Sequence, residues 1–193
     1  TNVWDSNYKG VYHLTDGTTP SYVDSTSNAN NGSATGSPSA VTGQIDGGVN
    51  FSASTDRVTV SAISTSSIDY TLSTWFYYPL NVNSAWNTIF RSSTAGHHII
   101  VQRSNLHLGL YDDGASGFVD SGFVMSTLST GWHHVAARTS SGSTLMYVDG
   151  AYVGTSANRI DNSLTYLGNC GACNDQQWGK ADEIRISTGI SRS

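Results

Sequence analysis

Two neighbouring stretches decide the fold: residues 132–138, WHHVAAR, and residues 144–153, TLMYVDGAYV. In both, aromatic or β-branched residues recur with a period of two, the pattern of a β-strand whose two faces differ. Asp149-Gly150 stands between two apolar runs of the second stretch. Glycine tolerates the positive φ that a tight primed turn requires, so this dipeptide predicts a β-hairpin.

The two-residue period extends over most of the chain, and no stretch of useful length has a helical period. It recurs in residues 57–61, 70–78, 99–101, 106–111 and 183–186. Turn signals separate these runs, which is typical of a sandwich or barrel of about ten to twelve strands. We therefore predict an all-β fold, an antiparallel β-sandwich, with residues 1–193 forming a single domain.

The composition excludes several classes of protein. Charged residues make up 12% of the chain, and a net charge of -5 without any basic cluster argues against nucleic-acid binding. No apolar run reaches the roughly 18 residues that a membrane span needs, so we expect no membrane insertion. The chain begins at Thr1 rather than Met, which is typical of a processed or excised segment. Its 13 aspartates accompany a single glutamate, Glu183, so a site built from two glutamates is impossible.

One segment without the strand pattern, residues 18–39, is rich in Ser, Thr, Asn, Gly and Pro and is predicted to be a long loop or a pair of loops. Loops of this length usually carry a function or an ion that orders them. Asp24, Asn28 and Asn30 supply closely spaced oxygens of the kind that Ca²⁺ selects. The alternative is an Asx-turn loop, in which these side chains bond their own backbone.

A second such segment, residues 168–178, holds both cysteines, Cys170 and Cys173. A redox dithiol normally stands at the start of a helix that follows a strand, and no such helix is evident here. A zinc site needs two further ligands, and no second cysteine pair is present to supply them. The sequence favours the remaining interpretation, a tight disulfide that stiffens a loop in an exported protein.

Eight short motifs follow one another along nearly the whole chain. They are GVYHL at residues 10–14, DSTSNANNG at 24–32, GGVNF at 47–51, DRVTV at 56–60, YTLSTWF at 70–76, WHHVA at 132–136, LMYVDG at 145–150 and GKADEIRI at 179–186. Their order resembles the laminin G-like domains of the concanavalin A-like lectin/glucanase superfamily. The resemblance implies a jelly roll with one concave and one convex sheet, in a secreted and often multi-domain parent protein.

The resemblance also bears on the ligand and the chemistry. It implies a structural Ca²⁺ between the 24–32 loop and the last strand, which would match Asp24 with Asp182. It places Glu183 in a final-strand pattern that serves as framework. Glycosidases of the superfamily carry a strand motif with two glutamates around an aspartate, and this chain has no such motif.

Sugars present apolar C–H faces and many hydroxyl groups, so their sites combine an exposed aromatic platform with polar side chains. Large aromatic residues more often pack in the core than form a platform, and we expect Trp4, Trp75 and Trp132 to lie in the core. In residues 106–111 the leucines define the buried face, which leaves His107 and Tyr111 on the other. The predicted sugar-binding residues are Trp86, Trp178, Tyr111, His107, Arg103 and Asp112.

The sequence thus predicts a non-catalytic carbohydrate-binding or adhesion module of a secreted or cell-surface protein. Its expected partners are a polysaccharide or glycan and the neighbouring domains of a larger parent protein. One alternative is a structural or protein–protein interaction module of a surface or viral assembly. A second is a polysaccharide-cleaving enzyme, for which Gln102, Arg103, His107 and Tyr111 would form the reacting group.

Overall fold

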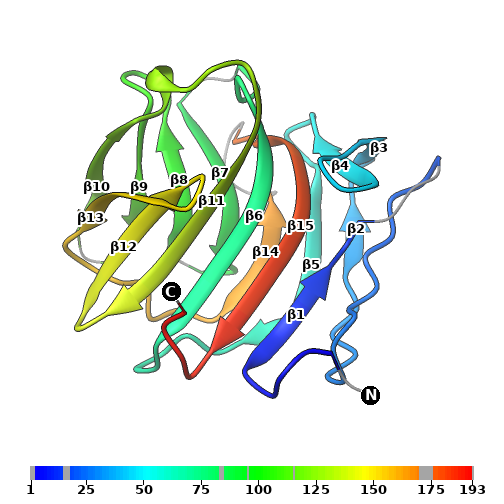
Figure 1. Ribbon diagram of the computed structural model, residues 1–193, viewed down its shortest axis with the longest axis horizontal. Coiled ribbons are helices and arrows are strands. Elements are labelled where there is room, and N and C mark those ends of the chain that lie inside the picture. Colours follow the sequence, from blue (N-terminus) through cyan, green and yellow to red (C-terminus); the bar gives the residue numbers. More distant parts are fainter. Residues whose placement is uncertain are drawn as a thin grey trace.

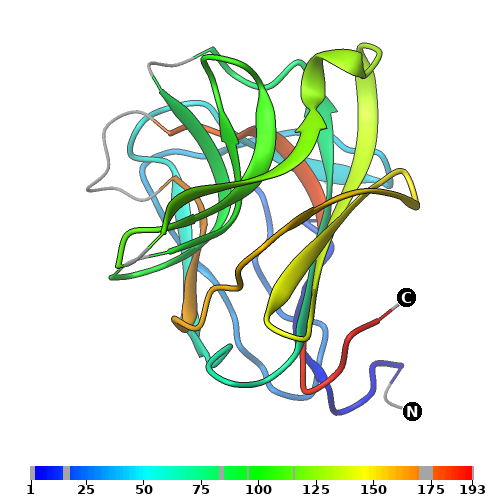
Figure 2. The ribbon, with the colours of Figure 1, turned by 90° about the vertical axis from the view of Figure 1, so that its left-hand side faces the viewer.

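The computed structural model describes residues 3–14, 18–82, 85–94, 96–114, 116–169 and 176–192. They form two antiparallel β-sheets packed face to face, which confirms the predicted all-β sandwich (Figure 1 and Figure 2). The eight-stranded sheet has the order β13-β12-β11-β6-β15-β4-β3, with β1 also paired to β15. The seven-stranded sheet has the order β10-β9-β8-β7-β14-β5-β2. Among the described residues, no helix combines the length and apolar character needed to cross a bilayer.

The strands are short and follow one another closely along the chain. Those of the eight-stranded sheet are β1 (Tyr8–Tyr12), β3 (Ser39–Thr42), β4 (Gly47–Phe51), β6 (Tyr70–Tyr78), β11 (Gly131–Ser140), β12 (Ser143–Val148), β13 (Ala151–Ser156) and β15 (Gly179–Thr188). Those of the seven-stranded sheet are β2 (Ser33–Thr35), β5 (Arg57–Ile63), β7 (Trp86–Ser92), β8 (His97–Gln102), β9 (His107–Asp112), β10 (Gly117–Val124) and β14 (Leu164–Gly168). One 3-10 turn, Met125–Thr127, follows β10.

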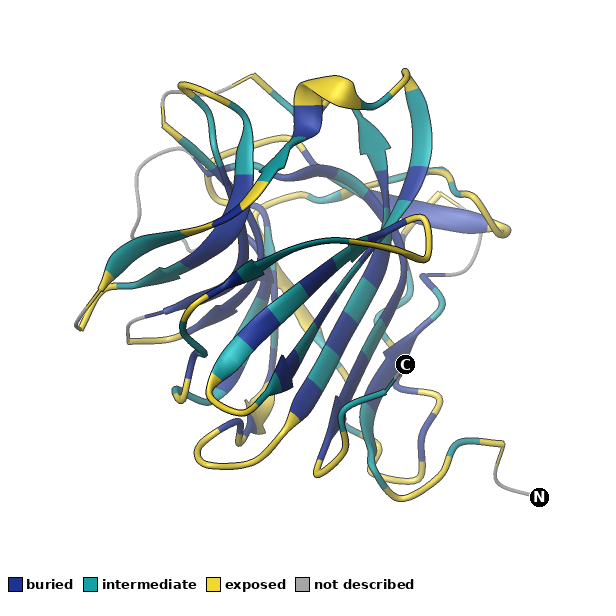
Figure 3. Ribbon diagram, turned by 60° about the vertical axis from the view of Figure 1, so that its left-hand side comes forward, coloured by how far each residue is buried: buried dark blue, intermediate teal, exposed yellow. Residues whose placement is uncertain are grey.

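The core lies between the sheets and is built from one face of each strand. In β6, Leu72 and Phe76 are fully buried, whereas Ser73 and Trp75 are partly exposed on the other face. The same alternation in β11 produces the bands of buried and intermediate residues visible in Figure 3. Because successive side chains of a strand point to opposite faces, this period fixes which side of each strand meets the core.

The predicted hairpin at Asp149-Gly150 is confirmed. Both residues have positive φ, 51° and 78°, as a type I′ turn requires. The Asp149 carboxylate accepts hydrogen bonds from the backbone N–H of His134, at 2.8 Å, and from the imidazole of His133, at 2.7 Å. The turn is therefore tied to the strand that precedes the hairpin.

The segment predicted as a long loop or a pair of loops, residues 18–39, contains a strand that was not predicted, because Ser33–Thr35 forms β2 and pairs with β5. All three residues of β2 are exposed, so neither face of this edge strand meets the core. A strand without a buried face leaves no alternation in its sequence, and pattern alone does not reveal it.

The three tryptophans that were predicted to lie in the core are partly exposed instead: Trp4, Trp75 and Trp132. Trp75 and Trp132 share the strand phase of polar residues and lie on the outer face of the eight-stranded sheet. There the ring of Trp75 meets that of His134, and the ring of Trp132 meets that of Tyr77. Size made them candidates for the core, but the phase of their strands decides where they lie.

Candidate functional site

Two of the predicted sugar-binding residues come together on the outer face of the seven-stranded sheet, the face turned away from the core. The rings of Trp86 in β7 and Tyr111 in β9 have centroids 5.2 Å apart at 75°. Phe118 in β10, which the sequence analysis did not single out, lies 5.3 Å from Trp86. The three partly exposed rings form one aromatic cluster.

Strand register explains this cluster. Tyr111 lies directly opposite Phe118 in the β9–β10 pair and opposite His97 in the β8–β9 pair, so all three share a face. Gly109 also lies on this face, where an added Cβ would come within 2.9 Å of the Phe118 ring and 2.4 Å of the Val119 carbonyl. The glycine therefore leaves the space that the Phe118 ring occupies.

A chain of polar groups adjoins the aromatic cluster. Arg91 Nε donates a hydrogen bond to His97 Nε2 at 3.2 Å, and His97 Nδ1 lies 2.9 Å from the hydroxyl of Thr88. Because a guanidinium only donates, His97 Nε2 must be the accepting nitrogen, and the proton therefore sits on Nδ1. His97 thus donates to Thr88, and its ring also packs 5.9 Å from that of Tyr111.

Burial controls the charge of this polar chain. His97 is 3% exposed, and burial, with the nearby Arg91 charge, lowers its pKa to about 3, so the imidazole is neutral at pH 7. Burial also lowers the pKa of Arg91, and the charge of Asp113 opposes that shift. Among the described residues, Arg91 makes no ion pair. Arg91 is itself only 5% exposed, so its cation lies beneath this face, and the neutral His97 sets its orientation.

Three further predicted residues lie nearby but outside the cluster. Arg103 follows β8, and its backbone N–H bonds the carbonyl of Ala85 beside Trp86. His107 shares the face of Tyr111 and binds Asp120 through Nδ1 at 2.5 Å. Asp112, adjacent to Tyr111 in the strand, accepts instead from the side-chain amide of Asn158 and from the N–H of Gly114.

The expectation that Trp178 lies exposed is wrong. Its side chain is fully buried, and its ring packs 5.7 Å from that of Phe76 in the core. The carbonyl of Trp178 lies 3.5 Å from the Asn81 N–H, and that of Gln176 accepts from Thr88 at 3.2 Å. The segment before β15 therefore lies against the sandwich, which places the indole inside.

The predicted calcium loop is held by its own hydrogen bonds. Asp24 accepts from the N–H groups of Val11, Thr26 and Asn30 and from the Thr26 hydroxyl, all at 2.8–2.9 Å. Burial raises the pKa of Asp24, but these donors outweigh that effect, so the pKa lies below its ordinary value. This is the Asx-type arrangement named above as the alternative.

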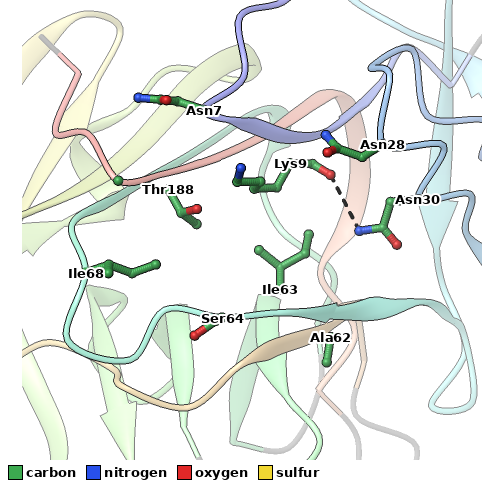
Figure 4. Close-up of a pocket in the computed structure, with 10 residues that line it drawn as sticks. Asn7, Lys9, Asn28, Asn30, Ala62, Ile63, Ser64, Ile68 and Thr188 are labelled. Carbon is green, nitrogen blue, oxygen red and sulfur yellow. Dashed lines mark hydrogen bonds between the residues drawn. The ribbon is translucent and has the colours of Figure 1, made fainter.

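Of the other predicted calcium ligands, Asn30 contacts Asp24 through its backbone N–H, and Asp182 has hydrogen-bond partners of its own. Asp182 is buried against another segment, where its carboxylate accepts from the N–H of Ile45 and that of Glu183. Asn28 and Asn30 line a shallow pocket that also holds the cationic Lys9, and the Asn30 amide donates to the Lys9 carbonyl (Figure 4). A shared ion would have to displace several N–H donors, so this set does not fit Ca²⁺ as it stands.

The predicted disulfide between Cys170 and Cys173 lies outside the described residues. Within the described ranges, no group of three or more His, Cys, Asp or Glu side chains is arranged to hold a metal ion.

Solved structures of similar fold include a domain of an arabinanase and the binding domains of two toxins. Domain 4 of AbnA, a GH43 extracellular arabinanase from Geobacillus stearothermophilus, was solved in complex with arabinotriose. It matches with a TM-score of 0.70 at 18% identity over 96% of this chain and 94% of that one. The binding domain of Paraclostridial Mosquitocidal Protein 1 gives a TM-score of 0.69 at 15% identity, over 97% of this chain and 50% of that one.

The binding domain of Botulinum Neurotoxin DC, in complex with SialylT, gives a TM-score of 0.63 at 12% identity, over 97% of this chain and 49% of that one. The chain thus spans about half the length of the two toxin domains. At these identities, the likeness establishes the fold alone. A search of curated protein sequences finds no significant match.

The family follows from the sequence itself. A laminin G-like family model matches residues 51–189, well over half of the chain, and this range contains every strand from β5 to β15. It also contains the aromatic cluster and the polar chain beside it. The chain belongs to the laminin G-like group of the concanavalin A-like lectin/glucanases superfamily.

Proposed function

We propose that this chain is a carbohydrate-binding module of an extracellular protein. It would bind a neutral or weakly charged glycan on the outer face of the seven-stranded sheet. The observation that carries the proposal is the contact between the aromatic cluster of Trp86, Tyr111 and Phe118 and the polar chain of Arg91, His97 and Thr88.

The exposed rings and the buried polar chain have different roles. Partly exposed rings offer flat apolar surface to the C–H face of a sugar, which burial then removes from water. Arg91, His97 and Thr88 are 5%, 3% and 0% exposed, so the polar chain lies beneath the aromatic cluster and supports it. Because the His97 ring packs against Tyr111 and is held by Arg91 and Thr88, the Tyr111 ring is positioned before a ligand arrives, which lowers the cost of binding.

The structural neighbours support the class of ligand. The AbnA domain, which the match covers almost in full, was solved in complex with arabinotriose. The neurotoxin binding domain, of which the match covers 49%, was solved in complex with SialylT. An extracellular location accords with the extracellular arabinanase to which the first of these domains belongs.

The test is a binding assay on a pair of matched tryptophan variants. Affinity electrophoresis through a panel of neutral polysaccharides, arabinan included, would identify a ligand, and calorimetry with its oligosaccharides would measure Kd. Trp86→Ala removes a ring from the cluster and is expected to weaken binding at least about tenfold, in line with loss of a buried aromatic contact. Trp132→Ala removes a ring from the opposite face and is the control.

Three results would contradict the proposal. The first is the absence of binding to any sugar by the folded protein, and the second is equal loss of affinity in both variants. The third is release of reducing ends during incubation with a polysaccharide, which would make the chain an enzyme rather than a binding module.

A further inference from the structure

A groove lies on the opposite side of the sandwich, on the outer face of the eight-stranded sheet. Its volume is about 530 Å³, within the usual range of about 300–1,000 Å³ for small-ligand sites. Residues of β1, β6, β11, β12 and β15 line it, together with Arg192 from the C-terminal segment. None of the predicted sugar-binding residues contributes to it.

Two cross-strand rows explain its shape. In the first row, Arg185 of β15 lies opposite Ser73 of β6, which lies opposite Ala136 of β11, which lies opposite Tyr147 of β12. Along the same sheet face, Trp75 and Trp132 carry large rings, whereas Ser73 and Ala136 are small. This step in side-chain size hollows the face between Arg185 and Tyr147.

The second row places another guanidinium on the same hollow. Ser187 of β15 lies opposite Thr71 of β6, which lies opposite Arg138 of β11. Arg138 of β11 and Arg185 of β15 therefore lie on opposite sides of β6, one in each row. Arg192 binds the Ser187 hydroxyl through Nε at 3.2 Å.

The groove gathers positive charge in an acidic protein. Three of the seven arginines of the chain line it, although the net charge is -5, and no Asp or Glu is among its lining residues. Two of the three are paired from outside the lining: Arg185 with Glu183 at 2.9 Å, and Arg192 with Asp5 at 2.8 Å. One uncompensated cation remains.

That cation is Arg138, which makes no ion pair with the residues that the structure describes. Neutral groups hold it in place: Nε donates to the Tyr147 hydroxyl at 3.0 Å, and Nη1 donates to the Ser191 hydroxyl at 3.1 Å. Its guanidinium also lies 5.6 Å from the centre of the Tyr147 ring. A fixed guanidinium of this kind matches a carboxylate, which accepts two parallel N–H bonds.

The rest of the lining is neutral and hydrogen-bonding. Thr71, Ser73 and Ser187 present hydroxyl groups, and His134 presents an imidazole beside Arg185. Burial and the charge of Arg185 both lower the pKa of His134. One cation among several neutral donors and acceptors fits a ligand with one negative charge and several hydroxyl groups.

We propose that this groove is a second ligand site, which takes a carboxylate-bearing saccharide with its carboxylate against Arg138. It is independent of the glycan site on the seven-stranded sheet, because the two lie on opposite faces of the sandwich. Two sources supply the same chemistry: a uronic acid within a polysaccharide, and a terminal sialic acid.

Calorimetric titration of the 193-residue chain tests the proposal. Trigalacturonate and 3′-sialyllactose represent the two sources of a sugar carboxylate, lactose is the neutral comparison, and sodium acetate is the anion without a sugar. We expect binding of one or both acidic sugars and neither of the other two. Arg138→Gln is expected to weaken that binding about tenfold to a hundredfold, the usual effect of losing a charged hydrogen bond.

Two further variants separate the groove from general electrostatics. Lys180→Gln removes a positive charge from the same sheet face outside the lining, where Lys180 lies over Tyr77, and is expected to leave affinity unchanged. Ala136→Leu fills the groove without changing charge and is expected to abolish binding, which keeps the test decisive if Arg138→Gln does not fold. Trp86→Ala is expected to bind the acidic sugar normally, so failure of the glycan site and failure of this groove are distinguishable.

The proposal is overturned if neither acidic sugar binds, or if lactose or acetate binds as well as the acidic sugars. Equal affinities of the Lys180→Gln and Arg138→Gln variants, both weaker than wild type, would assign the effect to net charge and also overturn it. Unchanged affinity of Ala136→Leu would place the ligand elsewhere.

Discussion

Two buried histidines make the stability of this domain depend on pH. His97 and His98 are 3% and 0% exposed, and burial lowers the pKa of each to about 3. In the unfolded chain a histidine has a pKa of about 6.5. Below pH 6.5 the unfolded state therefore binds protons that the folded state does not, and the free energy of unfolding falls as the pH falls.

The magnitude follows from the size of these shifts. One proton bound only by the unfolded state changes the free energy of unfolding by about 1.4 kcal/mol per pH unit. Between pH 6.5 and pH 5, each histidine removes about 2 kcal/mol, and the pair removes about 4 kcal/mol. The loss continues until the pH reaches the folded pKa of about 3. For a domain with typical stability of about 5–15 kcal/mol, this loss is large.

Two other groups act in the opposite direction. Burial lowers the pKa of His133, but its hydrogen bond to Asp149 outweighs that effect, so the pKa is raised. Burial also raises the pKa of Asp182. Raised folded values mean that both groups contribute stability that increases as the pH falls, which reduces the net slope. A comparison with a variant therefore isolates the contribution of a single histidine.

The assay is urea unfolding, followed by tryptophan fluorescence, at half-unit steps from pH 7 to pH 4. His97→Gln retains polar contact with Arg91 but has no titrating group. The slope of unfolding free energy against pH is expected to be about 1.4 kcal/mol per unit shallower in the variant than in the wild type. Equal slopes in the two proteins, or titration of the His97 ring near pH 6.5 by NMR, would refute the reasoning.

Three further predictions concern stability. Asp24→Ala leaves buried N–H donors without an acceptor and is expected to cost about 2–4 kcal/mol in urea unfolding, whereas EDTA is expected to leave Tm unchanged. A fall in Tm with EDTA that Ca²⁺ reverses would instead show an ion. Gly154→Ala places a Cβ 2.0 Å from the Ser121 carbonyl. It is expected to lower stability by about 1–3 kcal/mol, and an unchanged urea midpoint would contradict this. Trp178→Ala removes a fully buried ring and is expected to cost about 3–5 kcal/mol by the same assay. A loss below 1 kcal/mol would mean that the indole lies at the surface.

The sequence predicts a strand well where one face is buried and the other is not. In β6 and β12 the buried and partly exposed residues alternate as the printed sequence suggests, and both strands were expected. Prediction fails for β2, because an edge strand with no buried face leaves no pattern. The hairpin at Asp149-Gly150 needs only local turn chemistry, so it was predictable without knowledge of the rest of the fold.

The tryptophans show why residue size is a weaker guide than strand phase. Trp75 follows Thr71 and Ser73 at the two-residue period, and this signal was sufficient to place it on the outer face. Trp178 lies outside any strand, so no phase applies to it, and only tertiary packing against Phe76 shows that it is buried.

The aromatic cluster illustrates a different limit. Trp86, Tyr111 and Phe118 come from three strands, and their meeting depends on the register between strands. That register changes at bulges in the β7–β8 and β8–β9 pairs. The alternation of apolar and polar residues in these strands does not predict the bulges. Sequence reasoning therefore named two of these rings but had no signal that brings Phe118 to them.

A bulge in β15 also explains how one strand supplies both framework and groove. Between Trp75 and Ser73 of β6 there are two residue steps, but between their partners Asp182 and Arg185 there are three. The extra residue is Glu183, whose φ of 49° departs from extended backbone. Ile184 and Ile186 are buried in the core. In a strand without the bulge, Asp182 would lie on the same face as these two residues and would point toward the core. Glu183 is the bulge residue at which the strand register changes, and its carboxylate also binds Arg185. Its framework role therefore includes aligning that arginine with the groove.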